Sequence, residues 1–170
     1  MSRVLIVGAG YLARYLIPAL RARGDDVVAT TRSEERRAQL EALGAEVAHL
    51  DLAKIDANPL LTLYYDYVVY SAAPGRGGNR ELVFREGPVG VLERVNSLKL
   101  KRFVFTSSIG IYARADGSWV DEDSPPRTGD GKADLLEGEV NLLTVSAPVT
   151  VLRLGGLYGP ERSPIDWMGD

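Results

Sequence analysis

The first ten residues of the chain have types and a spacing that suit the binding of a dinucleotide. Val4 to Val7 form a short apolar run rich in β-branched residues, which predicts a strand buried on both faces of a parallel sheet. Gly8-Ala9-Gly10 follows directly, and residues 11–23 have the apolar spacing of a helix. Strand, glycine turn and helix in this order are the context in which a G-x-G-x-x-A pattern binds a diphosphate.

Each position of this pattern has a physical role. Gly8 allows the tight turn, Gly10 lets the backbone approach a diphosphate, and Ala13 keeps the helix close to the strand. Tyr11 and Leu12 open the helix, whose free N–H groups and positive dipole end favour phosphate oxygens. We therefore expect Gly8, Gly10, Tyr11 and Leu12 to bind the cofactor; the structural alternative is an ordinary glycine turn between a strand and a helix.

Cofactor choice is predicted from the end of the second strand. An NAD site usually has an acidic residue about 20 positions beyond the first glycine, bonded to the ribose 2′-hydroxyl. This chain has Arg32 there, flanked by Thr31 and Ser33, with Arg36 or Arg37 as a second cation. The pattern favours NADP, and NAD is the alternative. A purely structural interpretation is that Ser33 caps a helix and the arginines are solvated.

Six apolar runs alternate with helical segments along the whole chain. The runs are residues 4–7, 26–31, 45–50, 67–73, 101–107 and 149–154. This alternation predicts an α/β fold, a Rossmann-type doubly wound parallel sheet with helices on both faces. Right-handed crossovers favour the strand order 3-2-1-4-5-6. We expect residues 1–170 to form a single domain.

Composition excludes several classes of function. The chain of 170 residues is 45% hydrophobic, so it can bury a real core, and its net charge of −3 without a basic stripe argues against nucleic acid. It has no cysteine and a single histidine, His49, so the sequence predicts neither a metal cluster nor a Ser-His triad. We expect His49 to be a histidine with satisfied hydrogen bonds or one at the surface. No apolar stretch approaches the roughly 20 residues of a membrane span, and the first strand begins too early for a signal peptide, so we expect a cytoplasmic protein.

Further motifs follow the later strands and make a family resemblance specific. Asp51-Leu52 follows the third run, Ala72-Ala73 the fourth, Ser107-Ser108 with Tyr112-Ala113 the fifth, and Tyr158-Gly159-Pro160 the sixth. With the glycine turn, these motifs resemble the extended short-chain dehydrogenase/reductases, the family of NAD(P)-dependent nucleotide-sugar epimerases and dehydratases. The resemblance covers nearly the whole chain, with Ala113 in place of the usual glycine.

The resemblance implies roles for several residues. Asp51 would contact the adenine amino group, Leu52 would pack on the ring, and Ala72 and Ala73 would line the cofactor. Ser108 would bond a substrate hydroxyl or carbonyl. Structural alternatives are a turn capped by Asp51, close packing at the alanines, and local backbone contacts of Ser108. By analogy with the family, a homodimer is possible.

The proton-transfer pair of the family is missing. Its members carry a tyrosine on the next helix and a lysine four residues later, but this chain has no tyrosine between Tyr112 and Tyr158. If Glu139 is the glutamate that follows the family's lysine, Leu135 occupies the lysine position. Tyr112 and Lys132 are the remaining candidates for an acid. The pattern resembles the atypical branch of the family, which keeps the fold and the cofactor turn without the pair.

Two interpretations of the function therefore stay open. The family continues well beyond the Tyr-Gly-Pro motif, so we expect residues 161–170 to be the start of a missing substrate lobe. In one interpretation the protein is an NADP-dependent reductase, epimerase or dehydratase that acts on a carbonyl or sugar nucleotide through Ser108 and Tyr112, Lys132 or water. In the other it is a non-catalytic NADP(H)-binding module that senses the cofactor or supports a protein partner. The sequence does not identify a substrate.

Overall fold

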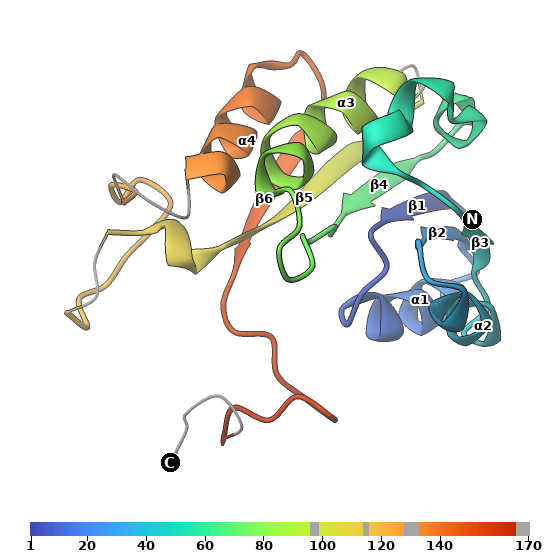
Figure 1. Cartoon of the computed structure of the whole chain (residues 1–170), viewed down its shortest axis with the longest axis horizontal. Coiled ribbons are helices and arrows are strands. Elements are labelled where there is room, and N and C mark those ends of the chain that lie inside the picture. Colours follow the sequence, from blue (N-terminus) through green and yellow to red (C-terminus); the bar gives the residue numbers. More distant parts are fainter. Residues whose placement is uncertain (96–98, 114–115, 128–132, 166–170) are drawn as a thin grey trace.

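A parallel sheet runs through the middle of the molecule. The computed structural model describes residues 1–95, 99–113, 116–127 and 133–165. They form a six-stranded sheet in the order β3-β2-β1-β4-β5-β6, which confirms the predicted order (Figure 1). The strands are β1 (Arg3–Val7), β2 (Asp26–Thr30), β3 (Glu46–Ala48), β4 (Tyr67–Tyr70), β5 (Arg102–Ser108) and β6 (Val149–Leu154).

Helices cover both faces of the sheet. In Figure 1, α1 (Ala13–Ala22) and α2 (Glu34–Ala42) lie against one face, while α3 (Gly87–Arg94) and α4 (Ala133–Thr144) lie against the other. Short helical turns complete the connections: η1 (Leu52–Ala57), η2 (Pro59–Thr62), η3 (Glu81–Glu86) and η4 (Ile109–Ile111). Among the described residues, none of these helices has the length and apolar character needed to span a bilayer.

The central strand β1 is buried on both faces, as its apolar run predicts. Leu5 and Val7 belong to the core under α3 and α4, whereas Val4 and Ile6 belong to the core under α1 and α2. All four side chains are buried. Because successive side chains of a strand point to opposite faces, a strand between two helical layers needs apolar residues at every position.

The helical segment that follows β4 begins with a π-helical turn, η3, which leads into α3 at Gly87 and Pro88. The Gly87 N–H donates to the Leu82 carbonyl, five residues back. In this register the next carbonyl, that of Val83, would accept from residue 88, but proline has no N–H. The buried Tyr70 hydroxyl donates to the Val83 carbonyl instead, at 2.6 Å. A side chain of β4 thus satisfies the carbonyl that Pro88 leaves without a donor.

We predict that Tyr70→Phe lowers the free energy of unfolding by about 1–3 kcal/mol, because it leaves the Val83 carbonyl without its donor. Chemical denaturation of the variant and of the unmodified chain measures the difference. Tyr67→Phe, on the same strand and partly buried, is the control and should change stability by less. An equal loss in the two variants would show that the Tyr70 hydroxyl does not hold the π-helical turn.

Candidate functional site

Two cavities adjoin at the carboxyl ends of the strands. The β2-side cavity, of about 190 Å³, is lined by residues that follow β1, β2 and β4 and by the start of η1. The β5-side cavity, of about 630 Å³, extends from the same turn after β1 to the ends of β5 and β6. Gly10, Ser71, Ala72 and Ala73 line both cavities. They meet where the strand order reverses between β1 and β4, the place where open α/β sheets bind ligands.

The glycine turn lies between the two cavities. Its two glycines differ in the space that surrounds each of them. Gly8 has a φ of +79°, and a Cβ there would overlap the backbone of Ala72. Its N–H donates to the Thr30 hydroxyl at 3.0 Å. A Cβ on Gly10 would instead meet only the Gly8 carbonyl oxygen, at 3.9 Å. Packing therefore requires glycine at position 8, whereas the space beside Gly10 is open to a ligand.

The first turn of α1 presents N–H donors to the β5-side cavity. Intrahelical bonding begins with the Ala13 N–H, which donates to the Gly10 carbonyl at 3.2 Å. No side chain caps the helix at Leu12. Within the described residues, the N–H groups of Tyr11 and Leu12 have no protein acceptor, and both residues line the cavity. Free N–H groups at a helix start are donors suited to a phosphate.

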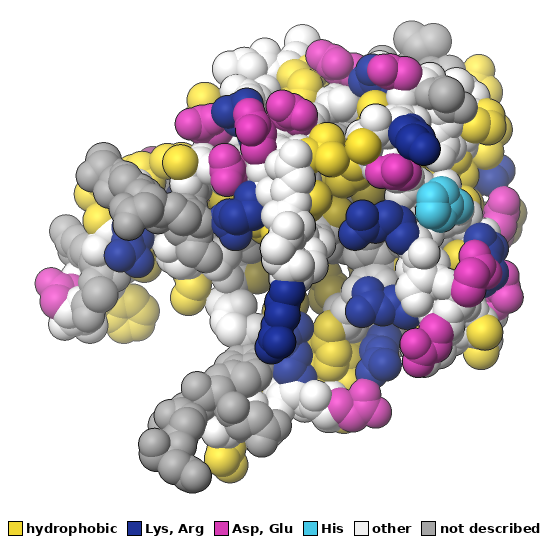
Figure 2. All heavy atoms as spheres, viewed as in Figure 1, with side chains coloured by type: hydrophobic (Ala, Val, Ile, Leu, Met, Phe, Trp, Pro, Cys, Tyr) yellow, Lys and Arg dark blue, Asp and Glu magenta, His cyan; other side chains and the backbone are white. Residues whose placement is uncertain are grey.

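Two arginines and a threonine that follow β2 form one wall of the β2-side cavity. Thr31, Arg32 and Arg36 all line it, as the NADP interpretation requires. Figure 2 shows Lys and Arg side chains gathered around the hollow in the middle of the face drawn there. The cavity therefore combines a small-residue floor with cations at one end, which suits an anionic group on the ligand.

Ser33 and Arg37 have structural roles. The Ser33 hydroxyl accepts from the Arg36 N–H at 3.3 Å and caps α2, as the structural interpretation expects. Arg37 donates to Glu34 at 3.1 Å and to the Val47 carbonyl at 2.9 Å. Neither residue is in the described lining of the two cavities, whereas Arg36 lines the β2-side cavity. Of the two candidates for a second cation, Arg36 and Arg37, the structure thus brings Arg36 to the cavity.

Asp51 and Leu52 lie on the wall of the β2-side cavity. The Asp51 carboxylate accepts from the Ala53 N–H at 3.1 Å and starts η1. Asp51 thus caps the start of η1 and also lines the cavity.

The end of β5 brings hydroxyls, but no proton-transfer pair, to the β5-side cavity. Ser108 lines it, and its Oγ accepts from the Gly110 N–H at 3.1 Å. Leu135 also lines it and is buried; it takes the position of the family's lysine if Glu139 is the glutamate that follows that lysine. Tyr112 is not part of its lining, and Lys132 lies outside the described residues. The structure therefore brings Ser108 to the cavity without Tyr112.

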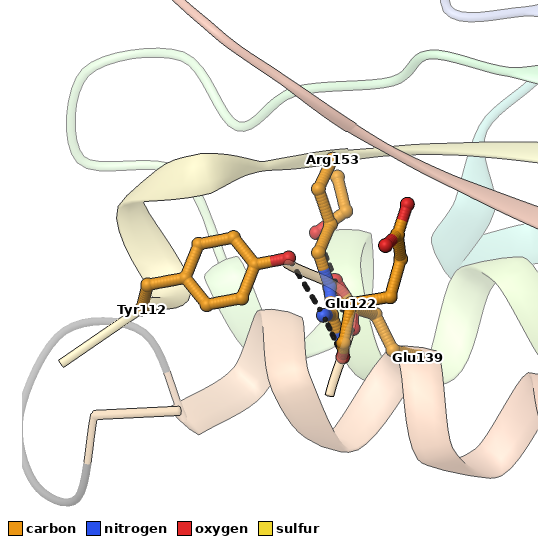
Figure 3. A network of polar contacts seen from close by, with 5 residues as sticks. Tyr112, Glu122, Glu139 and Arg153 are labelled. Carbon is orange, nitrogen blue, oxygen red and sulfur yellow. Dashed lines mark hydrogen bonds and ion pairs between the residues drawn. The ribbon is translucent and has the colours of Figure 1, made fainter. Parts of the chain in front are cut away.

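A buried ion pair that the sequence analysis did not predict lies beside this cavity (Figure 3). Glu139 on α4 is 1% exposed and accepts from Arg153 on β6, at 2.8 Å and 3.1 Å. Arg153 also donates to the Tyr112 hydroxyl at 3.0 Å and to the Glu122 carbonyl at 3.0 Å. Glu139 accepts a further hydrogen bond from Ser107. The sequence does contain a sign of this ion pair, because Arg153 is a charged residue inside the apolar run of β6.

The ion pair fixes charge states as well as positions. Hydrogen bonding to Glu139 holds the pKa of Arg153 above its usual value. Tyr112 serves this network, with its ring under the Arg153 guanidinium at 5.1 Å from the centroid. The arrangement joins α4, β6 and the segment around Glu122, so it is a structural support for the cavity wall.

Two further cations line the β5-side cavity, and the sequence analysis assigned neither to the site. Arg80 lies 3.6 Å from Asp134 of α4, and Arg162 follows β6. Tyr11 lies in the same lining. The hydrogen bond between its hydroxyl and that of Tyr15 raises the pKa of Tyr11, so the phenol stays protonated. Among the described lining residues of this cavity there is no carboxylate, lysine or histidine.

His49 is exposed, as predicted, and lies outside both cavity linings. Among the described residues, no three His, Cys, Asp or Glu side chains are grouped so that they could hold a metal ion.

The chain is similar to a protein-family model, to a curated protein and to solved structures. A family model described as NAD(P)H-binding matches residues 8–167. Protein YeeZ of Escherichia coli K12 is 29% identical over 171 residues, covering 96% of this chain and 62% of YeeZ. A solved structure of a provisionally named NAD-dependent epimerase/dehydratase from Methylobacillus flagellatus is 31% identical, with a TM-score of 0.76, over 95% of this chain and 56% of that one. The structure of a functionally unknown conserved protein from Silicibacter pomeroyi DSS is 27% identical, with a TM-score of 0.78, over 99% of this chain and 57% of that one. The chain thus spans less than two thirds of the length of each.

We predict that Glu139→Gln lowers the free energy of unfolding by about 3 kcal/mol, because it leaves the Arg153 charge without its partner. This is the lower end of the range for a broken buried pair, since the Arg153 side chain is 22% exposed. Glu137→Gln, on the same helix and 54% exposed, is the control and should cost less than about 1 kcal/mol. Denaturant unfolding of both variants measures the difference; equal small losses would contradict a structural role for the pair.

Proposed function

We infer the function of this chain from its family: the chain belongs to the NAD(P)H-binding proteins, whose model matches residues 8–167. It is an NAD(P)-binding Rossmann domain of the epimerase/dehydratase-like kind. We propose that it binds NADP(H) in preference to NAD(H), and that by itself it binds the cofactor without turning over a substrate. The observation that carries the proposal is the pair of adjoining cavities on either side of Gly10.

The residues present suit each part of a dinucleotide. In our proposal the Asp51 carboxylate accepts a hydrogen bond from the adenine amino group, and Leu52 packs on the ring. The N–H groups of Tyr11 and Leu12 donate to the diphosphate, and the open space beside Gly10 admits it. Ala72 and Ala73 provide a small floor on which the cofactor crosses from one cavity to the other.

The preference for NADP(H) rests on charge at the end of β2. Arg32 and Arg36 line the β2-side cavity together with the Thr31 hydroxyl, and two guanidinium groups suit a 2′-phosphate. Asp51 is the carboxylate in the described lining of this cavity, and it lies at η1, away from the end of β2. We therefore propose that no carboxylate accepts from a ribose 2′-hydroxyl here, as NAD selection would need.

The proposal of binding without turnover rests on the β5-side cavity. When bound, a nicotinamide dinucleotide supplies a hydride donor or acceptor, but reduction of a carbonyl also needs a proton. Leu135 brings an apolar side chain to the wall, and the phenol of Tyr112 is bonded to Arg153. Tyr11 is the one phenol of the described lining, and its raised pKa makes it a weak acid.

A second candidate function is an active reductase, epimerase or dehydratase that acts on a carbonyl or sugar-nucleotide substrate. The position of Ser108 favours it, because the Ser108 hydroxyl lines the β5-side cavity and could hold a substrate oxygen. The proton would then come from water or from an acid supplied by another part of a longer protein.

We predict that Arg32→Asp weakens NADPH binding at least tenfold, or about 1.4 kcal/mol, and leaves NADH binding within twofold. The reason is that the change replaces a cation at the 2′-phosphate by an anion, while NADH has no such phosphate. Calorimetric titration of both cofactors measures this. The control is Arg102→Asp, at the amino end of β5, which should alter neither affinity. Equal binding of NADPH and NADH before and after the Arg32 change would overturn the assignment.

We predict that the chain with saturating NADPH leaves the cofactor unoxidised when it is offered a panel of aldehydes, ketones and sugar nucleotides. Loss of the reduced-nicotinamide absorbance would support the second candidate instead. In that case Ser108→Ala should lower kcat with little change in cofactor affinity, since the alanine cannot bond the substrate oxygen.

A further inference from the structure

The chain that follows β6 returns to the start of α1. It leaves the sheet on the α1 side (Figure 1), and residues 158–162, the return segment, lie against the first turn of that helix. The Tyr11 hydroxyl donates to the Pro160 carbonyl at 3.1 Å, and Arg14 pairs with Glu161 at 2.6 Å. Backbone hydrogen bonds between Gly159 and Arg162, of 2.9 and 3.1 Å, close the segment into a tight turn. The contacts with Tyr11 and Arg14 hold the return segment against the start of α1.

The return segment brings Arg162 to the glycine turn. The Arg162 guanidinium carbon lies 5.3 Å from the centroid of the Tyr11 ring, an arrangement in which the ring attracts the cation. Arg162 lines the β5-side cavity together with Gly10, Tyr11 and Leu12. Arg162 therefore lines the same cavity as the residues whose N–H groups we propose as diphosphate donors, but it comes from a different part of the chain.

The charges of the site show what this cation could bind. A helix start offers about half a positive charge, which neutralises a diphosphate only in part. Arg32 and Arg36 line the other cavity, at the end of β2, and Arg80 lies beside Asp134 and over the Phe84 ring at 5.1 Å. Among the cations of the described lining, Arg162 is thus the one that lies against Tyr11, the residue directly after the glycine turn. A guanidinium can bond two phosphate oxygens at once.

We propose that Arg162 binds the diphosphate of the dinucleotide and holds it against the glycine turn. The inference rests on the proposed function and extends it to Arg162, which follows Gly10 by 152 positions in the sequence. Because NADPH and NADH share the diphosphate, Arg162 strengthens the binding of both, whereas Arg32 acts on NADPH alone. The return segment then serves as a strap over the cofactor, anchored by Tyr11 and by the Arg14–Glu161 pair.

Calorimetric titration of the full chain and of Arg162→Gln with four probes tests this proposal. NADPH, NADH and ADP-ribose contain the diphosphate, and adenosine 2′-monophosphate lacks it. We expect the variant to bind the first three at least tenfold more weakly and adenosine 2′-monophosphate unchanged. Arg162→Lys, which keeps the charge but loses the two-pronged bond, should fall between. Arg102→Gln removes the same charge from the amino end of β5 and should leave all four affinities unchanged.

The outcomes separate the inference from the proposed function. Dinucleotide affinities that are the same in Arg162→Gln and in the unmodified chain overturn the inference alone. An equal loss for adenosine 2′-monophosphate overturns it as well, because the change would then act on the whole site and not on the diphosphate. If the unmodified chain binds neither NADPH nor NADH, the proposed function falls and the inference falls with it.

Discussion

The close approach of the Gly8 backbone to Ala72 is the constraint on which the site depends. A Cβ at position 8 would overlap the Ala72 backbone, and the Gly8 N–H also bonds the Thr30 hydroxyl of β2. Three strand ends therefore meet at one point, where the order of the sheet reverses. Two cavities adjoin there with a floor of small residues, and this shape admits an extended dinucleotide across the sheet edge.

The other walls are held by polar groups buried under α3 and α4. Tyr70 bonds the carbonyl that Pro88 leaves without a donor, and so fixes η3, from which Val83 faces the β2-side cavity. Glu139 and Arg153 join α4 to β6 beside the β5-side cavity. In this protein the buried charges of Glu139 and Arg153 support the wall, and the described residues that line the β5-side cavity supply hydroxyls, apolar side chains and two cations, Arg80 and Arg162.

Electrostatics distinguishes the carboxyl edge of the sheet from the rest of the chain. The net charge of the protein is −3, yet Arg32, Arg36, Arg80 and Arg162 all line the two cavities. Cations in a cleft with low-dielectric walls focus the field on a bound anion. A ligand with phosphates at both the adenosine end and the middle matches this distribution, and we propose NADP(H) as that ligand.

The sequence by itself determined the strand order, the glycine turn and the positions of Asp51, Ala72 and Arg32 at the sheet edge. These features follow from strand periodicity, turn chemistry and crossover handedness, which are local or general rules. It also determined the lack of a tyrosine between Tyr112 and Tyr158. Only the tertiary structure decided which of Arg36 and Arg37 faces the cavity, paired Glu139 with Arg153, and brought the return segment to Tyr11. The hydrogen bond between Tyr11 and Pro160, for example, joins residues 149 positions apart, and the geometry of such contacts follows from packing that no local pattern encodes.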